Sequence, residues 1–233
     1  MPVQSGGGRR EARRERHAVR LPEELVLFDG DISSETFLDG VLVESPADGR
    51  QPTPAEPLVD VELTNSLLRS ARLTGRTFRR LHCRNVVFDG CDLSGVILHG
   101  SKMNAVEFHR CRLSGMVFGG ARLADVLFSN CKMDVVNLRM VEGRFLEFRE
   151  SDLRELDLYG ASITNLRIHD SDVSSADLST SSLAGDVRLH GSRLRELKGT
   201  ESLAGAVIGT EQLMDVAMML FAASGITVDD ERH

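Results

Sequence analysis

Side chains that could bind a metal or act as nucleophiles are thinly spread along this sequence. Its 233 residues include seven histidines and four cysteines, and the cysteines stand at positions 83, 91, 111 and 131. That spacing matches neither a CxxC zinc site nor the disulfide framework of small secreted domains. The motifs GxxxxGK, GxSxG and HExxH are absent, as is a GxGxxG that opens a helix. The sequence therefore predicts a non-enzymatic protein with no catalytic residues, metal site or cofactor.

Aspartates near the C-terminal end offer a different chemistry, the recognition of a basic partner. Asp152 and Asp172 are 20 residues apart, and so are Asp157 and Asp177. The surrounding residues 151–233 have a net charge of −7, whereas residues 61–150 have a net charge of +5. Two interpretations remain open, a solvated surface that keeps the protein soluble and an acidic patch that binds a partner.

The element that positions these residues is a repeat with a period of five. From Leu63 to Leu183, every fifth position is apolar in 24 of 25 cases, and the exception is Gly143. A second small or apolar residue stands two positions before most of them. A period of five fits neither an amphipathic helix nor an ordinary strand. It predicts a solenoid that buries one side chain in each five-residue unit.

A second period, of 20 residues, is superimposed on the period of five. Phenylalanine recurs at 88, 108, 128 and 148, and cysteine recurs at 91, 111 and 131. Coils with four five-residue sides, stacked at about 4.8 Å, would place each of these side chains on the next. We interpret the phenylalanines as core rather than as base-stacking platforms, and the thiols as small core residues rather than a reactive or metal-binding stack. His109 and His169 would lie three coils apart, about 14 Å, too far to share a metal.

These units, such as Cys91-Asp92-Leu93-Ser94-Gly95, resemble those of the pentapeptide-repeat family over residues 61–213. The resemblance implies an all-β solenoid, a right-handed quadrilateral β-helix whose central Leu or Phe points inward. It also implies a possible activity, because the Qnr and MfpA types in this family dimerise through their C-terminal end and bind DNA gyrase as DNA mimics. On that basis we expect Asp152, Asp157, Asp172 and Asp177 to form the partner-binding surface.

The sequence divides into six segments. We expect a basic flexible tail at 1–22, a degenerate first coil at 23–44, a proline-rich loop at 45–57, the β-helix at 58–209, a capping and dimerisation helix at 210–225 and a tail at 226–233. The repeat frame slips by one residue near Gly185 and Asp186, because an unbroken frame would bury Arg188, Arg193 and Lys198.

The helix expected after the β-helix has Thr210 as its N-cap and Gly225 as its stop signal. Its apolar residues surround nearly the whole cylinder, so they cannot all face one end of the solenoid. One stripe would cap the last coil and the other would need a second partner. We expect a homodimer through the residues of that second stripe, namely Leu213, Met214, Met218, Leu220 and Phe221.

The net charge of −7 argues against direct nucleic-acid binding, and no apolar run is long enough for a membrane span or a signal peptide. We therefore expect a cytoplasmic protein. The resemblance to the Qnr and MfpA types implies that it binds DNA gyrase or another type II topoisomerase and modulates it or protects it from inhibitors such as quinolones. The alternative is a solenoid scaffold for a different protein partner. A third possibility is nucleic-acid binding through the Arg-rich tail and a cluster of six arginines, namely Arg69, Arg72, Arg76, Arg79, Arg80 and Arg84.

Overall fold

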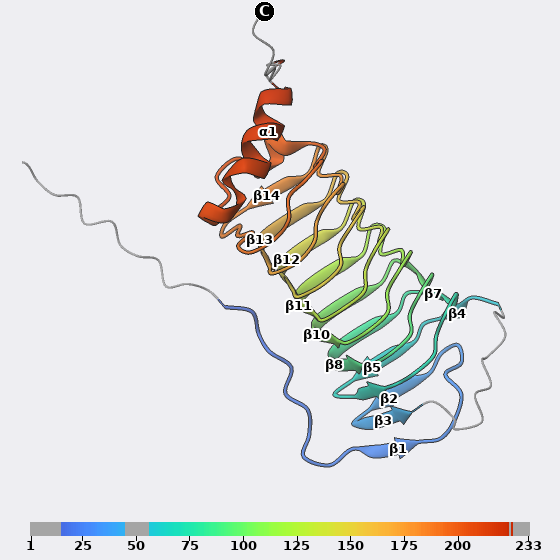
Figure 1. Ribbon diagram of the computed structural model, residues 1–233. Helices are drawn as coiled ribbons and strands as arrows, with labels where there is room; N and C mark the ends of the chain where they lie inside the picture. The colour runs from blue at the N-terminus through green and yellow to red at the C-terminus, as the bar shows by residue number, and fades with distance from the viewer. Residues whose placement is uncertain (1–14, 45–55, 224, 226–233) are drawn as a thin grey trace, which may run out of the picture.

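The computed structural model describes residues 15–44, 56–223 and 225. These residues form an elongated β-solenoid with a helix at its C-terminal end (Figure 1). The first strands are β1 (Val26–Phe28), β2 (Phe37–Asp39), β3 (Val41–Glu44), β4 (Leu58–Val59), β5 (Glu62–Thr64), β6 (Leu67–Arg69) and β7 (Thr77–Arg79). The strands that follow are β8 (His82–Asp89), β9 (Ile97–His99), β10 (Lys102–His109), β11 (Arg122–Ser129), β12 (Glu142–Arg149), β13 (Ser162–His169) and β14 (Ser182–Ala184).

From β4 to β14, paired strands of successive coils are parallel with a register of 20 residues, as the sequence period predicts. Strands β8, β10, β11, β12 and β13 are hydrogen-bonded neighbours, and Phe108 pairs with Phe88 on one side and with Phe128 on the other. The rings of Phe88, Phe108, Phe128 and Phe148 stack with centroid separations of 4.7, 4.8 and 5.0 Å. The cysteines at 83, 91, 111 and 131 are also buried. Both columns therefore belong to the core.

The coils turn at residues in the left-handed region of backbone conformation. Gly90, Gly95 and Gly100 hold this conformation at three successive corners, with φ between 61° and 66°. Glycine adopts such a φ without steric cost, which explains its recurrence at these positions. Val135 holds the same conformation with φ of 58°, which is strained for a β-branched side chain.

The frame slip predicted near Gly185 and Asp186 is confirmed by the register. Ile163 pairs with Leu183, 20 residues on, whereas Arg167 pairs with Arg188, 21 residues on. One extra residue therefore lies between these two pairs, and Leu189 and Leu194 occupy the core in place of the neighbouring arginines.

The N-terminal end of the solenoid shows one departure from the expected segments. Strand β1 pairs with β3, with Val26 opposite Val41, so the chain winds once between these two stacked strands. Residues 16–20, expected as part of a flexible tail, lie against the side of the solenoid, where carboxylates of β10 and β12 and of Asp125 contact them. Residues 1–14 of the tail expected at 1–22, the tail expected at 226–233 and most of the proline-rich loop, 45–55, lie outside the described residues.

The C-terminal cap begins as two short 3-10 helices, η1 (Thr200–Leu203) and η2 (Thr210–Gln212), and continues as α1 (Leu213–Ala223). Thr210 is not the N-cap, because Gly209 precedes η2 and its backbone N–H donates to the side chain of Gln212 at 2.7 Å. Gly225 has a φ of 69°, the left-handed conformation of a helix C-terminal stop. Val216 and Met219 of α1 pack against the solenoid core.

Candidate partner-binding surfaces

The four aspartates lie in two columns on neighbouring sides of the solenoid. Asp152 pairs with Asp172 in the next coil, and Asp157 pairs with Asp177. The 20-residue repeat thus brings together the carboxylates that the sequence analysis singled out. Further along the first column stand Asp92, Arg112 and Lys132, so acidic and basic side chains share one face of the coils.

Backbone and hydroxyl groups two residues downstream hold these carboxylates in place. Asp172 accepts hydrogen bonds from the backbone N–H of Ser174 at 3.1 Å and from its hydroxyl at 2.6 Å. The backbone N–H of Ser179 donates to Asp177 at 2.8 Å, and the contacts with Ser179 keep the pKa of Asp177 below its ordinary value. Because these contacts are local to each unit, they fix the direction of the carboxylates without help from a partner.

Cations of the same surface neutralise much of this charge. Arg154 donates to both oxygens of Asp152 at 2.7 Å, and this contact is the main reason that the pKa of Asp152 is lowered. Arg139 lies 3.1 Å from Asp157 and stacks on the ring of Tyr159, with its guanidinium carbon 4.3 Å from the ring centroid.

Asp172 is also paired with a cation, since Arg193 lies 3.5 Å from its carboxylate. Burial raises the pKa of Asp172, but hydrogen bonds from Ser174 and the charge of Arg193 outweigh it and lower the pKa overall. The aspartate columns therefore form a fixed set of carboxylates with interleaved arginines, rather than a field of uniform negative charge.

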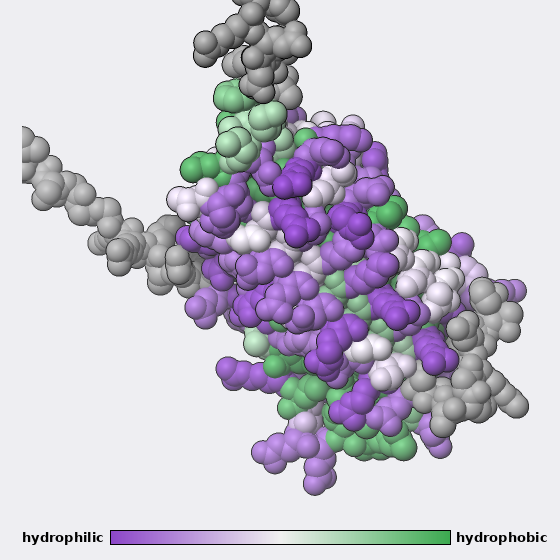
Figure 2. All heavy atoms as spheres, in the orientation of Figure 1, coloured by the Kyte–Doolittle hydropathy of each residue, from purple (hydrophilic) through white to green (hydrophobic). Residues whose placement is uncertain are grey.

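The C-terminal helix exposes the five residues that the sequence analysis assigned to a dimer interface. Their exposed fractions are 59% for Leu213, 72% for Met214, 51% for Met218, 55% for Leu220 and 39% for Phe221. The helix forms an apolar protrusion at one end of the molecule (Figure 2). One side of α1 therefore covers the last coil, and the other side has no cover among the described residues.

One residue at this end was missed by the sequence analysis. Gln212 is buried, and its side-chain amide donates to the carbonyl oxygens of Leu189 and Ser192 in the last coil. The Leu189 carbonyl also accepts the backbone N–H of Ser192 at 3.4 Å, whereas among the described residues the Ser192 carbonyl would otherwise lack the partner that a further coil provides. A lone glutamine before a helix carries no signal of this role, because the residue lies outside the repeat and its contacts with the coils follow no period.

The six arginines between Arg69 and Arg84 do not form one basic patch. They are spread over successive sides of a coil, with Arg69 on β6, Arg79 on β7 and Arg84 on β8. Arg80 pairs with Asp60 at 2.5 Å, and Arg76 is buried. This distribution does not favour the third possibility, nucleic-acid binding by the cluster.

Within the described ranges, no group of three or more His, Cys, Asp or Glu side chains could hold a metal ion. No helix in that part of the chain is long and apolar enough to cross a membrane. Burial raises the pKa of the Cys83 thiol to about 12, which leaves it protonated and unreactive at neutral pH.

Comparison of the chain with known structures returns other repeat solenoids. A trypsin-treated form of QnrB1, a plasmid-mediated fluoroquinolone resistance protein, is 20% identical, with a TM-score of 0.40, over 87% of this chain and 94% of that chain. HetL from the cyanobacterium Nostoc sp. strain PCC 7120, a pentapeptide-repeat protein involved in heterocyst differentiation regulation, is 14% identical, with a TM-score of 0.29, over 75% of this chain and 90% of that chain.

Comparison with curated protein sequences gives no match. The family model described as a pentapeptide repeat region matches residues 61–138 and 101–178, which together span just over half of the chain. The same residues form the stacked coils whose core positions recur every five residues. The chain belongs to the pentapeptide-repeat family.

Proposed function

We propose that this protein is a non-enzymatic interaction protein that dimerises through α1 and binds a protein partner with the outer faces of its coils. The observation that carries this proposal is the set of five exposed apolar side chains on α1. Monomeric soluble proteins rarely expose a contiguous stripe of this kind. In the proposed dimer a second copy of the chain covers this stripe, because a two-fold axis brings the same stripe of both protomers into contact.

For the partner we propose DNA gyrase or another type II topoisomerase, bound through Asp152, Asp157, Asp172 and Asp177 as a mimic of duplex DNA. A two-fold dimer through α1 would place these columns on both sides of the junction. The carboxylates are fixed by local contacts, and the arginines beside them are exposed, with 53% of the Arg154 and 73% of the Arg193 side chain accessible. Exposed ion pairs are weak, so the aspartates can exchange these arginines for cations of a partner.

A second candidate function is a scaffold for a different protein partner. The observation in its favour is the pairing of Asp152, Asp157 and Asp172 with arginines of the same surface, which lowers the net negative charge that duplex mimicry needs. A mixed surface of this kind suits a partner that presents both acidic and basic groups.

A gyrase supercoiling assay, run with and without a quinolone, separates the two candidates. At micromolar concentration the protein should inhibit supercoiling or restore it in the presence of the drug. Replacing all four aspartates with asparagine should abolish that effect. The matched control is Asp92→Asn, because Asp92 stands in the same column and makes the same contacts, to Ser94, at 3.1 and 2.7 Å. If the unmodified protein changes supercoiling neither with nor without the quinolone, the topoisomerase proposal is wrong and the scaffold function remains.

A further inference from the structure

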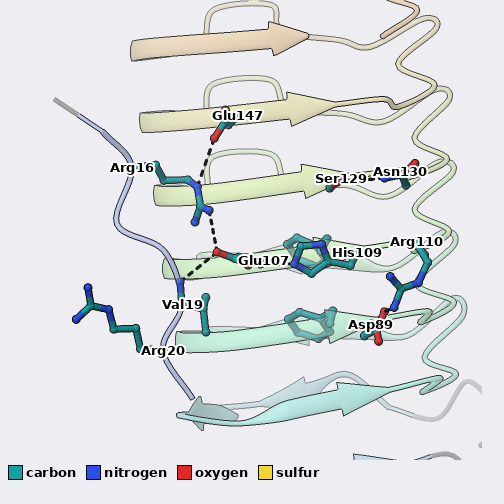
Figure 3. Close-up of polar contacts among 12 residues, drawn as sticks. Arg16, Val19, Arg20, Asp89, Glu107, His109, Arg110, Ser129, Asn130 and Glu147 are labelled. Atoms are coloured by element: carbon teal, nitrogen blue, oxygen red, sulfur yellow. Dashed lines mark hydrogen bonds and ion pairs between the residues drawn. The ribbon is translucent and has the colours of Figure 1, made fainter. Parts of the chain in front are cut away.

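Residues 15–20 form an extended segment that crosses several coils of the solenoid on its outer side (Figure 3). The backbone N–H of Arg20 donates to Asn85 at 2.8 Å, and the backbone N–H of His17 donates to Asp125 at 3.0 Å. The segment makes no strand pairing, so side chains of the solenoid hold it in place.

Arg16 is the anchor of this segment. Its guanidinium donates to Glu107 at 2.8 Å and lies 3.6 Å from Glu147, two coils further along. Glu107 also accepts the backbone N–H of Val19 at 3.1 Å. Only 11% of the Arg16 side chain is exposed, so the charge is desolvated and the two glutamates compensate it (Figure 3).

The surface under the segment combines three carboxylates with two apolar side chains, and we name it the acidic strip: Glu107, Asp125, Leu127, Phe145 and Glu147. Leu127 stands in register between Glu107 and Glu147. All five residues are at outward positions of the repeat, yet the accessible fraction is 5% for Leu127, 8% for Phe145 and 3% for the Asp125 side chain. Outward positions of a solenoid are normally solvated, so this burial reflects the cover that the bound segment provides.

The carboxylates of the strip also contact side chains of the solenoid itself. His109 lies 3.0 Å from Glu107, Arg144 lies 3.1 Å from Asp125, and Arg149 lies 2.7 Å from Glu147. Because all of these groups lie on the solenoid, the strip is preformed. Nε of Arg16 makes no hydrogen bond in the described part of the chain and lies 3.6 Å from the Glu147 carboxylate, so Arg16 pairs with Glu147 by charge alone.

We propose that the acidic strip is a binding site for an extended, arginine-bearing segment of a protein partner, and that residues 15–20 occupy it in the isolated chain. A partner segment would place its arginine between Glu107 and Glu147 and donate a backbone N–H to Glu107 three positions later, as Val19 does after Arg16. Because residues 15–20 belong to the same chain, they compete with the partner at a high effective concentration. The acidic strip therefore becomes accessible only when the contacts of residues 15–20 are weakened or displaced. This site is separate from α1 and from the aspartate columns, and its test is independent of the proposed function.

The test is the binding of a fluorescent peptide with the sequence of residues 12–22 to the full chain, followed by anisotropy. Arg16→Ala in the protein should open the strip, so the peptide should bind this variant at least 10-fold more tightly than the unmodified chain. Arg20→Ala is the matched control, because Arg20 contacts the solenoid through its backbone and its side chain points away (Figure 3). This control should behave as the unmodified chain.

Two further variants test the chemistry of recognition. Adding E107Q and E147Q to the Arg16→Ala protein should weaken peptide binding at least 10-fold, and so should alanine at the anchor arginine of the peptide. Hydrogen exchange should show faster exchange of the His17 and Val19 amides in the Arg16→Ala protein. If that variant fails to fold, Arg16→Gln replaces it. The proposal is overturned if the opened chain binds the peptide no better than the unmodified chain, if the glutamine variants bind equally well, or if the two amides stay protected.

Discussion

The side-chain amide of Gln212 lies 2.6 Å from the carbonyl oxygen of Ser192 and closes the last coil of the solenoid. Gln212→Ala removes the donor from two buried carbonyls, so we expect a loss of about 1–3 kcal/mol in the free energy of unfolding. Thermal or urea unfolding measures this loss. Thr210→Ala is the control, because Thr210 is exposed and next to the same helix start. Equal free energies of unfolding for the two variants would show that Gln212 does not stabilise the last coil of the solenoid.

The stacked phenylalanines should dominate the stability of the core. Phe128→Ala removes a fully buried ring between Phe108 and Phe148 and should cost about 3–5 kcal/mol, which a thermal melt would detect as a large fall in the midpoint. An unchanged melting midpoint would contradict the stacking of the phenylalanines in the core.

Cys111→Ser should cost much less than the loss of a phenylalanine. The same column holds Ser151, whose hydroxyl donates to the carbonyl of Arg149 at 2.7 Å and accepts the N–H of Cys131 at 3.1 Å. A serine at 111 can make the equivalent bonds, so we expect a melting midpoint close to that of the unmodified protein. A loss comparable to that of Phe128→Ala would show that the thiol column has a role beyond filling space.

These core predictions follow from sequence because periodicity is a property of the chain itself. The period of five fixes the inward positions, and the period of 20 aligns Phe88 with Phe108 before any coordinates are known. The pairing of Asp152 with Asp172 follows in the same way. What a period cannot predict is a contact between a segment without repeats and the solenoid. Arg16 and Glu107 are 91 residues apart and share no register, so their pairing is visible only in three dimensions.

The ion pair of Asp152 should make stability depend on pH in a defined direction. Its pKa is lowered in the folded protein by Arg154, so its stabilising effect is present above the ordinary value of 3.8 and is lost as the pH falls through the lowered value. Both side chains are partly exposed, so Asp152→Asn should cost only about 0.5 kcal/mol at pH 7 and less at pH 2. Urea unfolding at the two pH values measures this difference. A cost that is the same at both pH values would contradict an electrostatic role.

Light scattering at tens of micromolar protein measures whether α1 joins two copies of the chain. A dimer has a mass about twice the 25.6 kDa of one chain, and we expect that mass for the unmodified protein. Met218→Glu together with Phe221→Glu should give a folded protein of single-chain mass, because charges on the exposed stripe would be buried in the dimer. Val207, exposed but outside α1, supplies the control Val207→Glu, which should remain dimeric. A single-chain mass for the unmodified protein would contradict the dimer and remove the main support for duplex mimicry.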